Sequence, residues 1–149
     1  MRSGLTDRRA AVLAAALLAA APALAEDGEA LFEIHCAACH NTGGTGNPGL
    51  APPLDRPAFW QGLGEAAPEY LAGVMVSGLN GTLVVEGQTY AGLIMPPVAG
   101  TTDEELAEIG TWVLGTLGET GSALGVEEIA AARETRPSHA DLRAMRPAE

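Results

Sequence analysis

The feature that most constrains this chain is the hexapeptide HCAACH at residues 35–40. It places two cysteines and two histidines in six consecutive positions, although the whole chain of 149 residues has only two cysteines and three histidines. Four chemistries use such a cluster: a disulfide, a zinc ion, a redox-active dithiol and a covalently attached haem. Each requires a different fold around the motif, so the choice among them limits what the rest of the chain must build.

Three of the four interpretations need features that the sequence does not offer. A disulfide between Cys36 and Cys39 would close a very small loop, which constrains the unfolded chain little. A thioredoxin-like pair should follow a strand inside a βαβ unit, and no strand is predicted before Cys36. Zinc needs about four ligands, and the four side chains of the motif lie too close together in sequence to surround one ion comfortably.

The fourth interpretation needs no additional residues. The pattern C-x-x-C-H, formed by Cys36, Cys39 and His40, is that of c-type haem attachment. Two thiols three positions apart add to the two vinyl groups of a haem, and the adjacent histidine is then held under the iron as an axial ligand. We therefore expect one covalent haem c, with thioethers at Cys36 and Cys39 and an iron ligand at His40.

Residues 1–25 have the pattern of a cleaved secretory signal peptide. A basic start precedes the 12-residue apolar run 10–21, and residues 23–25, Ala-Leu-Ala, offer small side chains where a signal peptidase reads. This run is too short to span a bilayer, so we expect export to the periplasm and no membrane anchor in the mature chain. We expect residues 26–121 to form the haem-binding domain and residues 122–149 to form a tail, partly helical or loosely ordered.

The charge of the chain limits its partners. Its net charge is −11, with 19 acidic and 8 basic residues, none of them lysine. Such an acidic surface repels phosphate backbones and anionic membranes, which argues against nucleic acid as a partner. Four arginines lie in the last 17 residues, and this tail is a candidate docking segment: Arg133, Arg136, Arg143 and Arg146.

Local signals predict a mainly helical chain. Helices are expected where a cap, an apolar face and a terminating glycine coincide. They are residues 28–36, Pro68–Ser77 and 103–117, with a further short helix at Val126–Glu134. Four glycines and four prolines make residues 41–57 a loop. The β-branched run within residues 80–93 predicts a short hairpin or extended loop.

Met95 is the best candidate for the second axial ligand. It precedes Pro96 and Pro97, which favour an extended backbone and stiffen the loop, so that the thioether is aimed at a fixed point. Met75 lies on the apolar face of a predicted helix, where core packing explains it. The remaining sulfur and imidazole candidates after residue 25 lie in the tail or beside the attachment motif: Met145, His139 and His35.

Several segments in the right order resemble monohaem class I cytochromes c over about residues 27–118. Gly28 and Phe32 stand where that family has the small and aromatic residues of its N-terminal helix. Ile109 and Trp112 stand where its C-terminal helix crosses them. Close approach at the glycine and packing of the aromatic rings give this crossing its physical basis.

Two loops carry the resemblance to the ligands. GLAPPL, residues 49–54, is similar to the loop in which a proline carbonyl accepts the N–H of the proximal histidine. Pro52 aligns best with that proline, and Pro53 is the alternative. YAGLIMPP, residues 90–97, resembles the loop of the distal ligand, which makes Met95 the expected sixth ligand of the iron.

The resemblance implies an all-α fold, in which three to four helices surround one covalently bound haem and a short hairpin or extended loop precedes Met95. It also implies an electron-transfer protein and not an enzyme, because iron with both axial positions filled has no site open for a substrate. Arg56, Trp60 and Tyr90 are candidates for contacts with the haem or its propionates.

The segment at residues 78–96 resembles small cytochromes, or cytochrome domains, that serve bacterial periplasmic dehydrogenases. The lysine ring of mitochondrial cytochromes c is absent. The resemblance implies a periplasmic one-electron carrier that accepts electrons from a dehydrogenase and passes them to another carrier or a terminal oxidase. Two alternatives stay open: a haem enzyme or gas- or peroxide-binding protein in which Met95 is labile or absent from the iron, and a tightly bound cytochrome subunit of a dehydrogenase complex.

Overall fold

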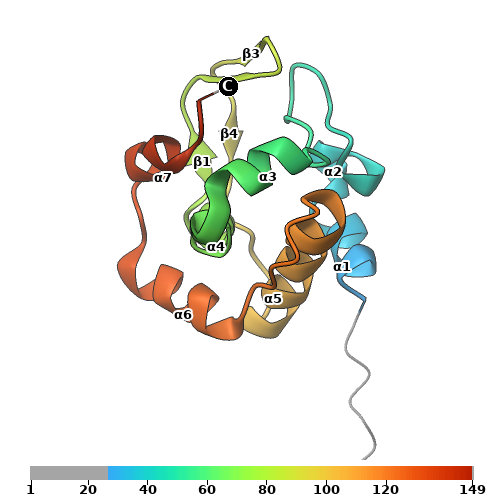
Figure 1. Cartoon of the computed structure of the whole chain (residues 1–149), viewed down its shortest axis with the longest axis vertical. Coiled ribbons are helices and arrows are strands. Elements are labelled where there is room, and N and C mark those ends of the chain that lie inside the picture. The colour runs from blue at the N-terminus through green and yellow to red at the C-terminus, as the bar shows by residue number, and fades with distance from the viewer. Residues whose placement is uncertain (1–26, 149) are drawn as a thin grey trace, which may run out of the picture.

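The structure is a computed structural model that describes residues 27–148, so the signal peptide predicted at residues 1–25 lies outside the described part. The described residues form seven α-helices. Their bounds are α1 Gly28–His35, α2 Ala37–His40, α3 Pro57–Leu63, α4 Ala67–Ser77, α5 Asp103–Trp112, α6 Val126–Thr135 and α7 His139–Met145. None of these helices is long and apolar enough to cross a membrane. Figure 1 shows α4 near the centre, with α1 and α2 on one side and α6 and α7 on the other.

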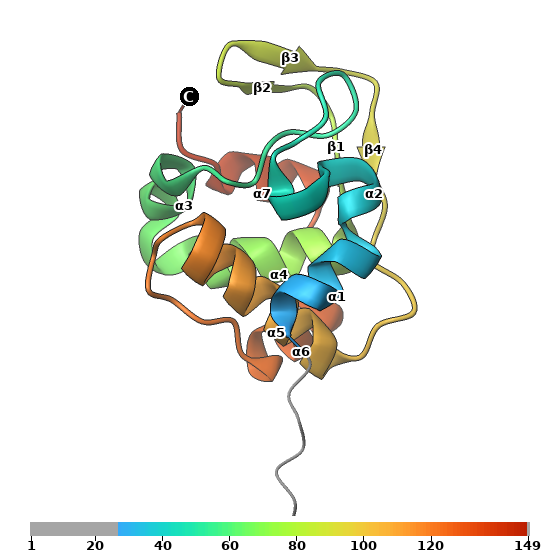
Figure 2. The same ribbon diagram turned by 90° about the vertical axis from the view of Figure 1, so that its right-hand side faces the viewer.

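The expectation of an all-α fold with three to four helices is wrong, because the chain also contains two antiparallel strand pairs. The strands are β1 Leu79–Asn80, β2 Leu83–Val85, β3 Gln88–Tyr90 and β4 Ile94–Met95. β2 and β3 form the predicted hairpin, and its two-residue turn, Glu86-Gly87, has φ angles of 51° and 79°. Positive φ at both turn residues matches the twist of paired strands. β1 pairs with β4 on either side of this hairpin. The two strand pairs form a strand ribbon that extends beyond the helices in Figure 2.

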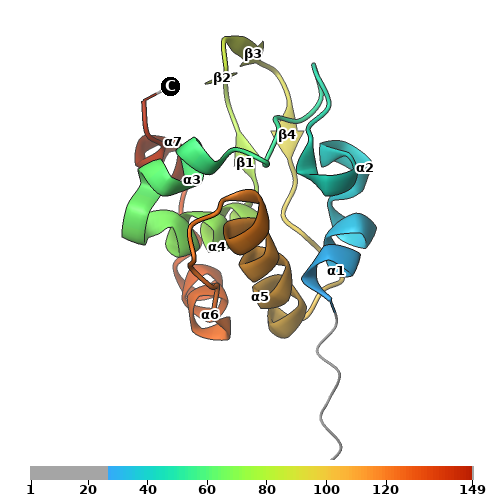
Figure 3. The ribbon, with the colours of Figure 1, turned by 45° about the vertical axis from the view of Figure 1, so that its right-hand side comes forward.

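Helices α1 and α5 cross at the contact that the sequence predicts. Asp27 caps α1 by accepting a hydrogen bond from the Glu29 N–H at 3.1 Å. A Cβ at Gly28 would collide with the Glu108 carbonyl oxygen and lie 2.9 Å from the Cβ of Trp112. The rings of Phe32 and Trp112 pack with their centroids 4.8 Å apart. The crossing, visible in Figure 3, therefore requires glycine on α1 and joins the first described helix to α5.

The predicted capping box begins α5. The Thr102 hydroxyl accepts a hydrogen bond from the Glu105 N–H at 3.1 Å, and the Glu105 carboxylate accepts one from the Thr102 N–H at 2.6 Å. Beyond Trp112 the helix continues as a π-helical turn at Val113–Leu117 and stops before Gly118. The apolar face predicted for residues 103–117 is therefore continuous, although its last turn is wider than an α-helix.

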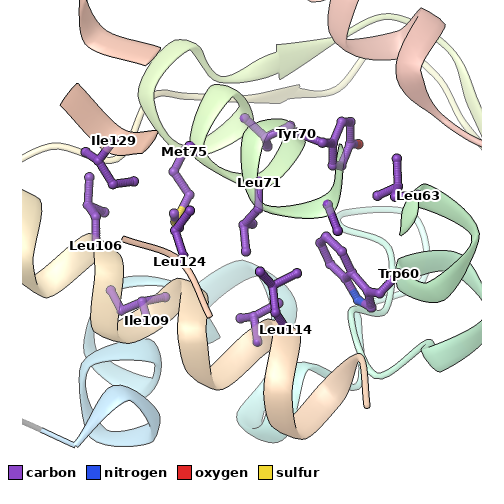
Figure 4. Packing of buried hydrophobic residues seen from close by; sticks show 14 of the residues in the cluster. Trp60, Leu63, Tyr70, Leu71, Met75, Leu106, Ile109, Leu114, Leu124 and Ile129 are labelled. Atoms are coloured by element: carbon purple, nitrogen blue, oxygen red, sulfur yellow. The ribbon is translucent and has the colours of Figure 1, made fainter. Parts of the chain in front are cut away.

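The core fills the space between α3, α4 and α5. Trp60, Leu71 and Leu114 lie in it, as does Met75, which is 3% exposed. Figure 4 shows the Met75 side chain directed from α4 toward Leu124. Core packing of Met75, expected from its helical face, is confirmed.

Residues 122–148 pack against this core. α6 lies against α4 and α5, and α7 lies against α4 and β1. Ile129 of α6 and Leu142 of α7 are both 0% exposed. Ser138 caps α7 by accepting a hydrogen bond from the Asp141 N–H at 3.2 Å. The sequence predicts α6, whereas α7 and α3 lie in segments for which no helix was predicted.

Candidate functional site

One cavity collects the chemistry-bearing residues of the chain. It has a volume of about 390 Å³ and walls formed by the attachment motif, the loop at residues 50–56, α4 and the strand ribbon. This volume lies within the roughly 300–1,000 Å³ typical of cofactor and small-molecule sites. All eight residues that the sequence assigns to haem or iron line this cavity: Cys36, Cys39, His40, Pro52, Arg56, Trp60, Tyr90 and Met95.

The two cysteines are free thiols at the cavity wall. Cys36 ends α1 and is half-buried, whereas Cys39 lies within α2 and is exposed. Burial, together with the neighbouring Cys39, raises the pKa of the Cys36 thiol to about 11. Cys36 is therefore a neutral thiol at neutral pH, unlike the low-pKa thiolate of a redox-active dithiol.

His40 is oriented by a backbone carbonyl. Its side chain is buried, and Nδ1 lies 2.9 Å from the Pro52 carbonyl oxygen. Because a carbonyl only accepts, Nδ1 must carry the proton, which leaves Nε2 with a free lone pair. Burial lowers the pKa of His40, and the Pro52 hydrogen bond opposes this shift. The result is a neutral imidazole of fixed tautomer, the form that binds a metal.

The glycine-rich loop holds Pro52 in place. Gly46 has a φ of 80°, and its N–H donates to the His40 carbonyl at 2.8 Å. A Cβ at Gly46 would lie 2.5 Å from the Pro53 nitrogen and 2.9 Å from the Pro52 carbonyl carbon. The loop therefore packs backbone against backbone, which is why the residue at position 46 must be glycine.

Strand pairing positions Met95. In the β1–β4 pair, Met95 lies opposite Leu79, which is separated from α4 only by Gly78. Gly78, with φ 75° and ψ −177°, ends α4, and a Cβ there would collide with the Met95 carbonyl oxygen. The Val98 N–H also donates to the Met75 carbonyl at 2.8 Å. Met95 is thus held against the end of α4 by close backbone packing as well as by the prolines that follow it.

The three candidate propionate contacts have different surroundings. The Trp60 indole N–H donates to the Leu54 carbonyl at 2.7 Å, so this donor is used within the protein. Tyr90 is 6% exposed and ends β3 at the cavity wall. The Arg56 guanidinium lies 4.9 Å from the centre of the Phe59 ring. Trp60 therefore supports the loop, and Arg56 and Tyr90 present polar groups near the cavity.

Two further polar residues of the cavity were missed by the sequence analysis. Tyr70 of α4 and Arg146 after α7 line the wall, and Arg146 donates to the Tyr70 hydroxyl at 2.9 Å. No local signal could place Arg146, because its contact joins residues 76 positions apart. His139, by contrast, lies away from the cavity lining, with Nε2 3.1 Å from the Ser77 carbonyl oxygen.

The donor set fits a haem better than the other interpretations of the motif. In the described residues no group of three or more His, Cys, Asp and Glu side chains could hold a metal ion by itself. The lining of the cavity instead includes two thiols, the imidazoles of His35 and His40 and the thioethers of Met75 and Met95, on largely apolar walls. These are the groups that attach and ligate a c-type haem.

Comparisons with known proteins agree with this chemistry. Residues 23–113 match the family described as cytochrome c oxidase, cbb3-type, subunit III. The chain is 38% identical over 97 residues to a cytochrome c-552 of Thermus thermophilus, which covers 65% of each chain. A second cytochrome c-552 of Thermus thermophilus is 37% identical over 83 residues, which cover 56% of this chain and 62% of the relative. The chain thus spans just under two thirds of the length of these relatives.

Proposed function

The chain belongs to the cytochrome c family, as a monohaem class I cytochrome c with covalently bound haem c, and on this basis we propose that it is an exported one-electron carrier whose iron is bound by His40 and Met95. The observation that carries the proposal is that one cavity is lined by both cysteines and by both proposed iron ligands. Haem c supplies an iron that gains and loses one electron.

The attachment motif holds the haem on one side. In the proposal, Cys36 and Cys39 form the thioethers and His40 Nε2 binds the iron. The hydrogen bond from Nδ1 to the Pro52 carbonyl supports this role, because it fixes the ring and makes Nε2 a better donor.

Met95 determines the class of chemistry. If His40 and Met95 held the iron, oxygen, peroxide or a substrate would find no open ligand position, and the chemistry supplied would be electron exchange. A soft thioether ligand and apolar walls favour the ferrous state, so we expect a relatively positive reduction potential. Arg56 and Tyr90 contact the propionates in this proposal, while Trp60 stabilises the loop that carries Pro52 through Leu54.

The protein is proposed to work in the periplasm after removal of residues 1–25, with residues 26–121 as its cytochrome domain and residues 122–149 as a C-terminal extension. Its redox partners are a periplasmic dehydrogenase as donor and another carrier or a terminal oxidase as acceptor. The family description names an oxidase subunit, which supports an oxidase on the accepting side. Leu50 and Ile94 line the cavity and are 44% and 69% exposed, which supports a small, transient docking interface at its mouth.

Absorption spectra test the carrier against the haem enzyme or ligand-binding protein. The purified holoprotein is measured oxidised and reduced, with and without carbon monoxide. We expect a six-coordinate c-type spectrum with a sulfur-ligand band in the ferric state and little change on adding carbon monoxide. Rapid carbon monoxide binding by the wild-type protein would contradict the carrier function.

Covalent attachment and assembly need separate measurements. Haem should stay with the wild-type polypeptide after denaturation and acid extraction, whereas the double variant Cys36→Ala, Cys39→Ala should release it. Co-purification of a dehydrogenase with the protein at moderate salt would favour a tight complex subunit over a free carrier.

A further inference from the structure

The cavity has an unusual charge for this chain. Residues 27–148 include 16 acidic residues and five arginines. Within the described part of the chain, two of those arginines line the cavity, Arg56 and Arg146, and none of the carboxylates does. A cavity wall that carries two cations and no carboxylate, in so acidic a chain, is suited to binding an anion.

Both guanidinium groups lie against one aromatic ring. The Arg56 and Arg146 Cζ atoms lie 4.9 Å and 4.6 Å from the centre of the Phe59 ring, and Phe59 is 6% exposed. The ring attracts each cation, but two like charges near one buried ring repel each other. Glu86, on the exposed hairpin turn, lies 3.7 Å from Arg56 Nε and offsets part of that repulsion.

The fold fixes the position of Arg146. It follows α7 directly, and α7 is anchored by Leu142, which is 0% exposed and packs in the main core. Arg143, one turn earlier, donates to the Asn80 carbonyl at the end of β1. The Tyr70 hydroxyl then holds Arg146 itself. In Figure 2, α7 lies between the helical core and the strand ribbon, which is consistent with these contacts.

We propose that Arg146, delivered by the C-terminal helix α7, is with Arg56 a cationic anchor for the carboxylates of the haem and raises its reduction potential. A cation in a partly buried site stabilises bound carboxylates and opposes the gain of positive charge when iron is oxidised. The C-terminal segment is in this view a part of the haem pocket and not only a docking tail. The inference rests on the proposed function, because it requires haem in this cavity.

The test compares variants of two arginines on the same segment. The reduction potential of each holoprotein is measured by spectroscopic redox titration. For Arg146→Gln we expect the ferrous-to-ferric ratio at a fixed ambient potential to fall roughly three- to tenfold, where tenfold corresponds to about 59 mV for one electron. Arg143→Gln removes the same charge from α7 at a residue that contacts Asn80 but does not itself line the cavity, so its potential should change less than that of Arg146→Gln while its melting temperature falls. Arg146→Lys keeps the charge and should restore most of the potential.

Tyr70→Phe gives an independent route if Arg146→Gln does not fold. It removes the hydroxyl that holds the guanidinium, and a smaller shift in the same direction is expected. A wild-type potential in Arg146→Gln and Tyr70→Phe, or an equal shift in Arg143→Gln, would overturn the inference while the c-type spectrum stays intact. Absence of a covalent haem from the wild-type protein would instead overturn the proposed function.

Discussion

Replacing Gly78 with alanine should displace Met95 from the haem iron without touching a ligand. Gly78 has φ 75° and ψ −177°, a backbone conformation that is essentially restricted to glycine. A Cβ there would collide with the Met95 carbonyl oxygen and lie 3.0 Å from the Pro97 nitrogen. Alanine therefore strains the end of α4 and pushes β4 away from β1 at the residue that carries the thioether.

Two costs determine the size of the effect. An L-residue in this backbone region costs about 1–3 kcal/mol, and overpacking against the Met95 backbone costs about 1–3 kcal/mol more. Moving β4 relieves the second cost, so up to about 3 kcal/mol favours displacement of Met95. At ~1.4 kcal/mol per factor of ten, the population with sulfur bound should fall by about tenfold to roughly one hundredfold.

The assay is the ferric absorption spectrum of the holoprotein together with its rate of carbon monoxide binding in the ferrous state. Gly78→Ala should weaken or abolish the sulfur-ligand band and speed carbon monoxide binding. Gly92→Ala is the matched control, because Gly92 has a φ of 72° but nothing lies within 4 Å of a Cβ there. It should lose about 1–2 kcal/mol of stability and keep the band. An unchanged spectrum in Gly78→Ala, or equal loss in both variants, would refute the view that this contact holds Met95.

Three further substitutions test the fold around the site by urea unfolding. Gly28→Ala should lower the free energy of unfolding by about 1–3 kcal/mol, because its Cβ collides at the α1–α5 crossing. Gly115→Ala, with open space around its Cβ, should be neutral or stabilising by up to about 1 kcal/mol. Equal effects of the two substitutions would contradict the close approach at Gly28. Thr102→Ala removes the capping box of α5 and should cost about 1 kcal/mol, and no loss would mean that the cap is dispensable. Trp60→Phe leaves the Leu54 carbonyl without its indole donor and should cost about 1–3 kcal/mol while haem remains attached; loss of haem would instead assign Trp60 a role in holding it.

Local chemistry made much of the site predictable. The spacing of Cys36, Cys39 and His40 and the capping box of α5 both involve signals within a few residues of each other. The aromatic contact at the α1–α5 crossing joins distant residues, and it was expected only from the resemblance to class I cytochromes c. A glycine or a cap restricts the backbone at its own position, so its consequence can be read from the sequence.

What the sequence did not predict depends on contacts between distant segments. The β1–β4 pair joins residues that lie 14–16 positions apart, and two-residue strands carry no periodic pattern. Helix α7 is short, and Leu142, its one fully buried side chain, packs on residues far earlier in the chain. The all-α expectation failed for this reason, and Arg146 was assigned to a docking tail because its position depends on α7.

The central claim is that Met95 is the sixth ligand and makes the protein an electron carrier. The most direct test measures the ferric sulfur-ligand band and carbon monoxide binding in Met95→Ala, with Met75→Leu as control. Met75 also lines the cavity but packs in the core, so leucine there should conserve volume and preserve the band at a cost below about 1.5 kcal/mol. We expect Met95→Ala to lose the band and bind carbon monoxide rapidly. A band that survives in Met95→Ala, or that disappears in Met75→Leu, would contradict the assignment.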